Sequence, residues 1–421
     1  MNLNFYKKNF GKIKISLTVM IFSAVGCTKK ANDNSDKIPW LLAAASLQKS
    51  ASTSTSTAST YSVGGTITGL SSAGLVLQNN SGDDLTVASG ATSFTFATKV
   101  SGAYSVTVKT QATARNCTLT NSSGTASANV TSVAITCSSD GSSWTSKTLP
   151  SASTWTSVAY GNGIFVAVAS GGTAAASSPD GVTWTARTLP SSASWNSVTY
   201  GNGIFVAVAG GPSTTAASST DGITWTARTL PSSSQWNQAG YGNGVFVTAA
   251  TGPSTNGASS TDGITWTART MPASAGWMSP AYGNGIWTYI CSSSTTAASS
   301  TDGANWTART MSASATWQSV AYGNGVFAAV AYGGTAAQTS TDGITWTART
   351  LPSSSNWRSV TFGNGIFLAV ADTGTIAATS ADGITWTART LPASANWFAT
   401  AYGNGTFVTI AQGSTSAAVS Q

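Results

Sequence analysis

The sequence predicts an all-β protein: a seven-bladed β-propeller with four-stranded blades and a split closing blade, preceded by a small β-sandwich module. Three observations support this fold class. A stretch typified by Thr220–Thr229 occurs seven times with few changes. The copies follow one another at steps of 40 or 41 residues, a spacing typical of repeat architectures. No part of the repeat carries the periodicity of an amphipathic helix.

Each repeat divides into four short strands rich in aromatic, β-branched and small residues. In the copy around Trp225 they are expected at 195–200, 204–209, 215–220 and 223–229, with Pro231 ending the last. The turn residues Gly201-Asn202-Gly203 follow the first strand, and Asp221-Gly222 precedes the last. The Asp-Gly pair predicts a type I′ hairpin, in which both central residues have positive φ. Four strands in one such repeat match a propeller blade.

The two ends of the repeat region supply complementary parts of one blade. The first copy contributes only a fourth strand, around 142–149, and the last contributes only three, from Trp397 to about Val419. A ring needs such a split, because the N-terminal strand then completes the C-terminal sheet. Closure also removes strand edges that would otherwise pair with other chains. Residues 139–421 are therefore expected to close into seven blades.

Residues 1–26 are interpreted as an export signal. Lysines precede an apolar run, 15–25, that is too short to span a bilayer as a stable helix. The run ends at Ala24-Val25-Gly26-Cys27, which resembles the lipobox of bacterial lipoproteins. That resemblance implies a diacylated Cys27 that anchors the mature protein to a membrane; the alternative is an ordinary signal peptide with an incidental cysteine. Thr28 replaces the Asp that acts as an inner-membrane retention signal, which favours the outer membrane.

Residues 27–60 are expected to be a lipidated tether, because 50–59 consist of Ser, Thr and Ala and lack the apolar bulk needed to pack. Residues 61–138 are expected to form a separate small β domain. Its runs of strand-forming residues lie at 62–68, 74–78, 94–97, 104–109 and 133–137. The domain resembles the short immunoglobulin-like modules of bacterial surface proteins. Cys117 and Cys137 are predicted to form a disulfide, because an exported chain meets an oxidising compartment.

The composition excludes several classes of function. Charged residues make up 7% of the chain, and residues 139–421 contain one Lys, seven Arg and eight Asp, so this part carries no net charge. The formal +7 of the whole chain therefore gives no case for a nucleic-acid partner. The chain contains neither His nor Glu, which rules out Ser-His-Asp and Cys-His catalysis and any His-based metal site. We expect no enzymatic activity, no cofactor and no metal.

The stretch Ser219-Thr220-Asp221-Gly222-Ile223-Thr224-Trp225 resembles the Asp-box (BNR) repeat of sialidase-like propellers, with Asp and Gly adjacent in every copy here. The resemblance covers about 139–421 and implies a propeller with structural hairpins at the blade periphery. The repeat Asp residues are expected to accept local backbone N–H bonds; they are Asp140, Asp180, Asp221, Asp262, Asp302, Asp342 and Asp382. Sialidases use an arginine triad, a Tyr–Glu pair and an Asp acid, and this chain lacks the Glu.

Three further repeated series of residues are expected to belong to the scaffold or to a solvent-exposed edge. The repeat Trp residues are more simply the core between blades than sugar-stacking platforms; they are Trp144, Trp184, Trp225, Trp266, Trp306, Trp346 and Trp386. A second series begins the presumed inner strands: Trp155, Trp195, Trp236, Trp277, Trp317, Trp357 and Trp397. The repeat Arg residues either reach solvent, stack on an aromatic or pair with a neighbouring Asp; they are Arg187, Arg228, Arg269, Arg309, Arg349 and Arg389. Cys291 is expected to be a buried, inert thiol.

The residue after the second tryptophan differs between copies, while its surroundings stay nearly constant. If the inner strands line a central channel, these residues form one ring of mixed side chains, called the variable ring: Thr156, Asn196, Asn237, Met278, Gln318, Arg358 and Phe398. We predict that the variable ring binds the ligand, together with loop residues that also differ between copies, such as Tyr332 and Asp372. The alternative is drift at an exposed position.

The sequence thus predicts a cell-envelope lipoprotein, a monomer, that acts as a non-enzymatic binding or adhesion module. Its expected partners are the membrane, through the lipid anchor, and a glycan, a peptide or a host or envelope protein at the propeller rim. Two alternatives remain open: an envelope scaffolding or assembly factor, and a degenerate sialidase-like enzyme acting on glycosides. A convergent pair of acids would favour the enzyme, and a wide neutral rim would favour the binding module.

Overall fold

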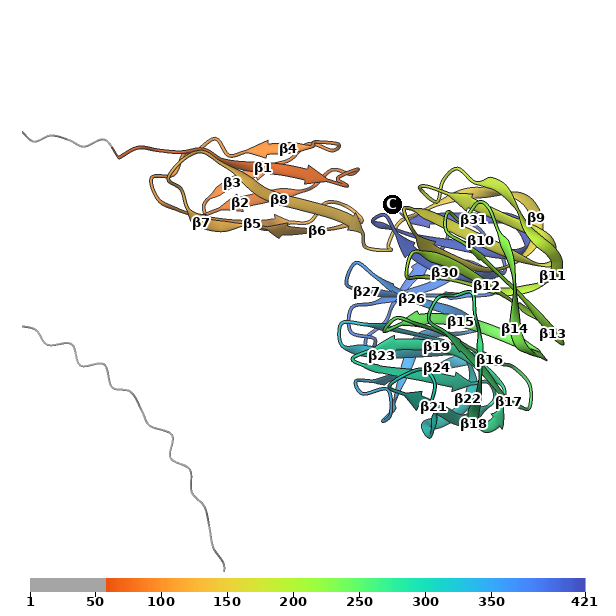
Figure 1. Cartoon of the computed structure of the whole chain (residues 1–421). Helices are drawn as coiled ribbons and strands as arrows, with labels where there is room; N and C mark the ends of the chain where they lie inside the picture. The colour runs from red at the N-terminus through yellow and green to blue at the C-terminus, as the bar shows by residue number, and fades with distance from the viewer. Residues whose placement is uncertain (1–57, 421) are drawn as a thin grey trace, which may run out of the picture. The chain divides into compact units, whose positions relative to one another are not determined.

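The computed structural model describes residues 58–420, and every regular element in that part of the chain is a β-strand (Figure 1). No helix in these residues is long and apolar enough to cross a membrane. The predicted export signal at 1–26, the lipidation site at Cys27 and nearly all of the tether at 27–60 lie outside the described residues. The all-β fold class is confirmed for the described residues.

The strands between Val63 and Ser139 form two four-stranded sheets around one hydrophobic core. They are β1 (Val63–Thr68), β2 (Val76–Asn79), β3 (Asp83–Thr86), β4 (Ser93–Thr95), β5 (Ala103–Thr110), β6 (Arg115–Thr120), β7 (Ser123–Thr125) and β8 (Val130–Ser139). The sheet orders are β4-β1-β8-β6 and β3-β2-β5-β7, and β1 pairs with β8 in parallel. The runs expected from sequence fall on β1, β2, β4, β5 and β8. β3, β6 and β7 were missed, because polar residues dominate them.

Cys117 and Cys137 form the predicted disulfide, with an S–S distance of 2.02 Å. They lie directly opposite each other on the antiparallel strands β6 and β8, and both side chains are buried in the core of this module. Cys291, in the repeat region, is a free and fully buried cysteine. Burial raises the pKa of its thiol, which agrees with the inert role expected from the sequence.

The remaining strands belong to the repeat region. The first group comprises β9 (Trp144–Gly161), β10 (Ile164–Ser178), β11 (Thr185–Gly201), β12 (Ile204–Gly210), β13 (Ser213–Ser219), β14 (Thr226–Ser234), β15 (Trp236–Gly242), β16 (Val245–Ala250), β17 (Ser254–Ser260) and β18 (Thr267–Ala275). The second group comprises β19 (Trp277–Gly283), β20 (Ile286–Cys291), β21 (Ser294–Ser300), β22 (Thr307–Gly323), β23 (Val326–Tyr332), β24 (Gly334–Ser340) and β25 (Thr347–Ser355). The last group comprises β26 (Trp357–Gly363), β27 (Ile366–Ala371), β28 (Ile376–Ser380), β29 (Thr387–Thr390), β30 (Trp397–Gly403) and β31 (Thr406–Ser420).

Each repeat folds as an antiparallel meander, as in the four-stranded sheet β15-β16-β17-β18. The inner segment of each meander is its first strand, which begins at a second-series tryptophan. The outer segment is its last strand, and it often continues without a break into the inner segment of the next repeat. The first part of β11 pairs with β10 and its last part with β12, so one strand serves two meanders. The expectation that Pro231 ends a strand is wrong, because β14 continues to Ser234. Pro231 falls in a register shift of the ladder, where no backbone N–H is needed.

The repeat region closes on itself. The second half of β31 pairs antiparallel with the first part of β9, with Ala418 opposite Ser146 and Ser420 opposite Trp144 (Figure 1). The N-terminal strand therefore completes the C-terminal sheet, as the split ends of the sequence predicted. The inner segments of β9, β11, β15, β19, β22, β26 and β30 are neighbours in that order, and β30 contacts β9 again.

A glycine at the end of each inner segment lies against an aromatic ring of the next repeat. A Cβ on Gly201 would lie 1.9 Å from Cγ of Tyr241, so only the hydrogen of glycine fits under the ring. The same contact recurs around the whole circle and closes between Gly403 and Tyr160. The pairs are Gly161–Tyr200, Gly201–Tyr241, Gly242–Tyr282, Gly283–Tyr322, Gly323–Phe362, Gly363–Tyr402 and Gly403–Tyr160. These contacts fix the spacing between neighbouring inner segments.

The two repeated turns have different geometries, and this corrects one prediction. Asn202 and Gly203 have φ of 48° and 78°, and Gly201 pairs with Ile204 across them. The type I′ hairpin is therefore at Asn-Gly. At Asp221-Gly222 only the glycine has positive φ. The predicted type I′ turn is wrong there, because the Asp221 carboxylate binds the backbone ahead of it and so shapes a wider turn.

Hydrophobic clusters in the repeat region lie between neighbouring meanders. One cluster combines Val166 and Val168 of β10 with Trp195, Phe205 and other residues of the following repeat. All seven second-series tryptophans are fully buried. The repeat Trp residues also belong to these clusters, which agrees with a scaffold role for both series.

The repeat Asp residues bind local backbone groups, as expected. The Asp221 carboxylate accepts N–H bonds from Ile223 and Thr224, both at 2.8 Å, and a hydroxyl bond from Ser219 at 2.9 Å. Equivalent bonds recur at Asp180, Asp262, Asp302, Asp342 and Asp382, whereas the Asp140 carboxylate binds Ser142 alone. The backbone N–H of Thr265, with further local bonds, lowers the pKa of Asp262 to about 2.

These carboxylates predict a stability that falls in acid. Because the folded-state pKa lies below the unfolded value, the stabilisation is present above pH 3.8 and is lost as the pH falls towards about 2. Denaturant unfolding followed by tryptophan fluorescence at several pH values should show this decrease. Asp262→Asn should weaken the pH dependence, since one titrating group is removed. A free energy of unfolding that stays constant over this pH range would contradict the prediction.

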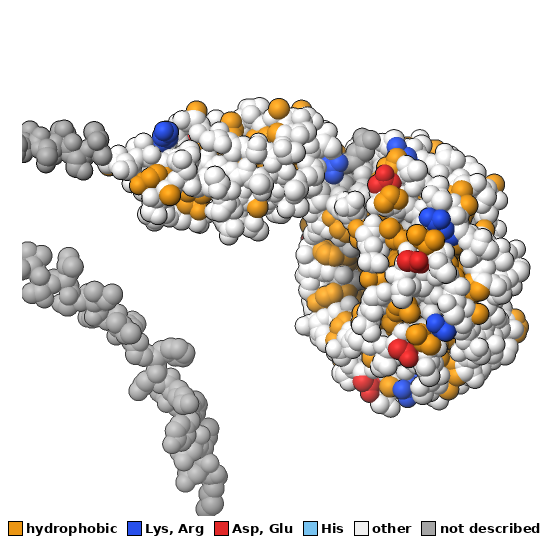
Figure 2. All heavy atoms as spheres, turned by 45° about the horizontal axis from the view of Figure 1, so that its top comes forward, with side chains coloured by type: hydrophobic (Ala, Val, Ile, Leu, Met, Phe, Trp, Pro, Cys, Tyr) orange, Lys and Arg blue, Asp and Glu red, His pale blue; other side chains and the backbone are white. Residues whose placement is uncertain are grey.

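The repeat Arg residues make a contact that the sequence did not predict. In each copy Nε donates to a hydroxyl on the neighbouring strand, as from Arg228 to Ser218 at 2.9 Å. The other donors are Arg187, Arg269, Arg309, Arg349 and Arg389. None of them pairs with an Asp, and within residues 58–420 the only ion pair is Lys109–Asp84. On the face drawn in Figure 2 the charged side chains are few and scattered singly.

Candidate functional site

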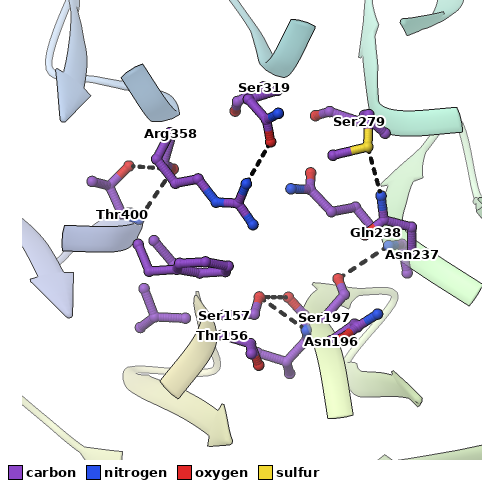
Figure 3. A pocket seen from close by; sticks show the side chains of 18 of the residues that line it. Thr156, Ser157, Asn196, Ser197, Asn237, Gln238, Ser279, Ser319, Arg358 and Thr400 are labelled. Carbon is purple, nitrogen blue, oxygen red and sulfur yellow. Dashed lines mark hydrogen bonds between the residues drawn. The ribbon is translucent and has the colours of Figure 1, made fainter. Parts of the chain in front are cut away.

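The structure brings all seven residues of the variable ring together around one cavity of about 340 Å³. Figure 3 shows this cavity, with Thr156, Asn196 and Asn237 along one part of its wall and Arg358 reaching towards its centre. The residues come from seven different inner segments, far apart in sequence. Comparison of the repeats therefore identified a set of residues that share one location.

A backbone irregularity directs each variable-ring residue into the cavity. In every repeat the ladder between the inner segment and its partner shifts register directly after the second-series tryptophan or beside it. Trp195 pairs with Ala209 and Ser197 with Val208, so Asn196 has no opposite residue. An extra residue of this kind is a β-bulge, which changes the direction of a side chain and is common beside binding sites. Trp195 can therefore fill the core while Asn196 faces the cavity.

Three polar members of the variable ring bind the backbone of the following repeat. The Thr156 hydroxyl donates to the carbonyl of Trp195 at 2.6 Å. The amides of Asn196 and Asn237 donate to the carbonyls of Trp236 and Trp277, at 3.1 and 3.2 Å. These bonds run around the ring from one repeat to the next. They hold the cavity wall in place and leave the amide oxygens to accept bonds from a ligand.

The other side of the variable ring carries a charge. Nη1 of Arg358 donates to Oε1 of Gln318 at 2.6 Å, and its Cζ lies 4.0 Å from the centre of the Phe398 ring. Stacking on an aromatic face and a bond to an amide oxygen orient the guanidinium. Burial lowers the pKa of Arg358, and the nearby Asp372 opposes this shift.

A second depression of about 430 Å³ adjoins this part of the ring and shares Gln318, Arg358 and Phe398 with the cavity. Tyr332 and Asp372 also line it. Tyr332 ends β23 and Asp372 directly follows β27. Both positions differ between copies, so the sequence had already singled them out. Tyr332 is 38% exposed, and Oδ1 of Asp372 is buried without a hydrogen-bond partner in the described residues.

A layer of serines was missed by sequence reasoning. Two residues after the second-series tryptophan, the Ser157 hydroxyl accepts the backbone N–H of Val198 at 3.0 Å. The equivalent acceptors are Ser197, Ser279, Ser319 and Ser359, and all five line the cavity. Their repetition at one position was the available signal. Serine is common throughout this chain, however, so its repetition alone does not indicate a bond between repeats.

The chemistry of the cavity is that of recognition by hydrogen bonding, stacking and charge. Its lining offers amides, hydroxyls, one guanidinium and an aromatic ring. Within residues 58–420 no group of three or more acidic, His or Cys side chains lies close enough to hold a metal ion. The repeat Asp residues do not line the cavity, so they supply no convergent acids there.

No protein-family model matches the sequence, and no curated protein matches it either. Solved structures do resemble it. Virginiamycin B lyase from Staphylococcus aureus is similar at 12% identity, with a TM-score of 0.59 over 66% of this chain and 99% of that one. A streptogramin B lyase is similar at 10% identity, with a TM-score of 0.59 over 66% of this chain and 96% of that one. YCF48 bound to a D1 peptide is similar at 16% identity, with a TM-score of 0.54 over 67% and 96%.

These likenesses show the fold alone: the repeat region is a β-propeller. The propellers it resembles include enzymes as well as a peptide-binding protein. The fold therefore does not decide between catalysis and binding, and the residues of the cavity have to carry that argument.

Proposed function

We propose that this chain is a non-enzymatic binding module whose ligand occupies the cavity of the variable ring. The observation that carries the proposal is the convergence of seven unlike side chains on one cavity, each presented by a bulge beside an invariant tryptophan. Thr156, Asn196 and Asn237 also bond to the next repeat, but a purely structural role does not require seven unlike side chains at one position. The side chains that differ between repeats are the ones that meet a ligand.

The proposal includes the wider architecture. The repeat region is a seven-bladed propeller of the Asp-box type, supported by the cyclic order of its inner segments and by the carboxylate-bound turns. The preceding module is immunoglobulin-like, supported by its two sheets around one core. Cys27 is lipidated and holds the monomeric protein at the bacterial cell envelope, at the outer membrane, as its lipobox-like sequence implies.

A binding array tests the function. The purified protein is applied to immobilised glycans, peptides and host or envelope proteins, beside the double variant Arg358→Ala/Phe398→Ala. We expect a specific ligand that the wild type retains and the double variant loses. Arg389→Ala is the matched control, because it removes an arginine from an outer strand, where Nε binds Thr379.

Equal retention of that ligand by both proteins would place the site elsewhere and overturn the proposal. A folded protein that retains nothing on the array would also count against it, and would favour a scaffolding role with a membrane partner.

A further inference from the structure

The Arg358 guanidinium has donors that the protein does not use. A guanidinium carries five N–H groups in a planar fork, and the hydrogen bonds of Arg358 within residues 58–420 involve only Nη1, with Gln318. Phe398 covers one face of the group and Gln318 holds one edge. Figure 3 shows the head of Arg358 directed into the cavity. The free edge is therefore presented to whatever enters.

Arg358 is the only basic residue lining the cavity or the adjoining depression, and Asp372 is the only acidic one. They form no ion pair with each other. Removing a charge from water without pairing it is costly, so a partly buried cation and anion in one depression each favour a ligand group of opposite charge. Oδ1 of Asp372 is buried without a donor in the described residues, so the other carboxylate oxygen is the one that a ligand can reach.

We propose that this part of the cavity binds a zwitterionic ligand of the amino-acid or short-peptide kind, an inference that rests on the proposed function. Arg358 binds the carboxylate through two parallel N–H bonds, the arrangement that a guanidinium fork favours. Asp372 binds the ammonium group. Phe398 and Tyr332 provide apolar surface for the side chain or chains between them.

The charges also exclude other ligand classes. A phosphate or sulfate ester would bring a second negative charge or a bulkier anion next to Asp372, which repels it. A neutral glycan would offer hydroxyl partners to Arg358 and Asp372 but no opposite charge, so it would forgo the stronger hydrogen bonds that form between oppositely charged groups. The cavity and the adjoining depression together have the size of a small-molecule site, since such sites typically measure about 300–1,000 Å³.

Blocked peptides test the proposal. The probe is an equimolar library of tripeptides in four forms: free, C-terminally amidated, N-terminally acetylated and doubly blocked. Equilibrium dialysis with the full chain, followed by mass spectrometry, measures the bound fraction of each form. We expect the wild type to retain the free form at least about tenfold better than either singly blocked form, as for the loss of one charged hydrogen-bonded contact.

The variants assign each preference to one residue. Arg358→Gln should abolish the preference for a free carboxylate and keep the preference for a free amine. Asp372→Asn should do the reverse, and the control Arg389→Gln should keep both. No preference in the wild type, no retention of any form, or an unchanged carboxylate preference in Arg358→Gln would each overturn the inference. The array decides the proposed function separately, since a neutral ligand lost in the double variant would uphold binding and refute the zwitterion.

Discussion

Gly201→Ala is expected to destabilise the repeat region by about 3 kcal/mol or more, at the upper end of what overpacking costs. The new Cβ would lie 1.9 Å from Cγ of Tyr241 and little farther from two other ring carbons. Tyr241 packs against Phe246, with ring centroids 4.7 Å apart, so the ring cannot turn away without losing that contact. Gly201 does not have positive φ, so the cost is one of space. Denaturant unfolding followed by tryptophan fluorescence measures it.

Gly203→Ala is the matched control. Gly203 has a φ of 78°, and a Cβ added there would have no atom within 4 Å, so alanine meets only backbone strain of about 1–2 kcal/mol. Adding Tyr241→Ala to Gly201→Ala should recover part of the loss, because the two residues are coupled. Equal destabilisation by Gly201→Ala and Gly203→Ala would show that the aromatic contact does not set the spacing between repeats.

Deleting residues 414–421 is expected to abolish cooperative unfolding of the repeat region. The deletion removes the segment of β31 that pairs with the start of β9, and with it the buried residues Ala417, Ala418 and Val419. Burial of Val419 alone contributes about 1.5–3 kcal/mol, against a net stability of about 5–15 kcal/mol for a typical protein. The start of β9 also becomes an open edge that other chains can join.

Thermal unfolding and size-exclusion chromatography check this second result. The truncated protein should lose its sharp transition and form larger species, whereas a control lacking only residue 421 should behave as the wild type. A truncated protein that stays monomeric with an unchanged midpoint would show that ring closure adds no stability.

Much of the site was predictable, because the chain contains its own comparison. Seven copies of one unit show directly that the residue after each second-series tryptophan varies while the tryptophan itself does not. That contrast identified Arg358, Asn196 and the rest of the variable ring. It did not show how they are held. The bulge that turns Asn196 inward arises from the pairing of two strands. The residue that donates a hydrogen bond to Gln318 depends on which repeat lies beside it.

Predictions from local sequence also failed where a side chain binds the backbone or an adjacent strand. The pair Asp221-Gly222 is a strong hairpin signal, yet its carboxylate accepts two backbone N–H groups and produces a different turn. The repeat Arg residues likewise bind hydroxyls on the adjacent strand, such as Ser218, instead of reaching an Asp. Both outcomes depend on atoms that come close only after the chain has folded around them.

The sequence by itself determined the strand class, the repeat unit, the split closing sheet and the disulfide between Cys117 and Cys137. The first three follow from residue type and spacing along the chain, which folding does not change, and the disulfide follows from the expected export of a chain with two cysteines in one small domain. The tertiary structure alone decided that Gly201 supports Tyr241, that Arg358 lies on Phe398 beside Gln318, and that Asp372 shares a depression with Arg358. These are contacts that chain order does not specify, and they exist only once closure of the ring has fixed the distance from each repeat to the next.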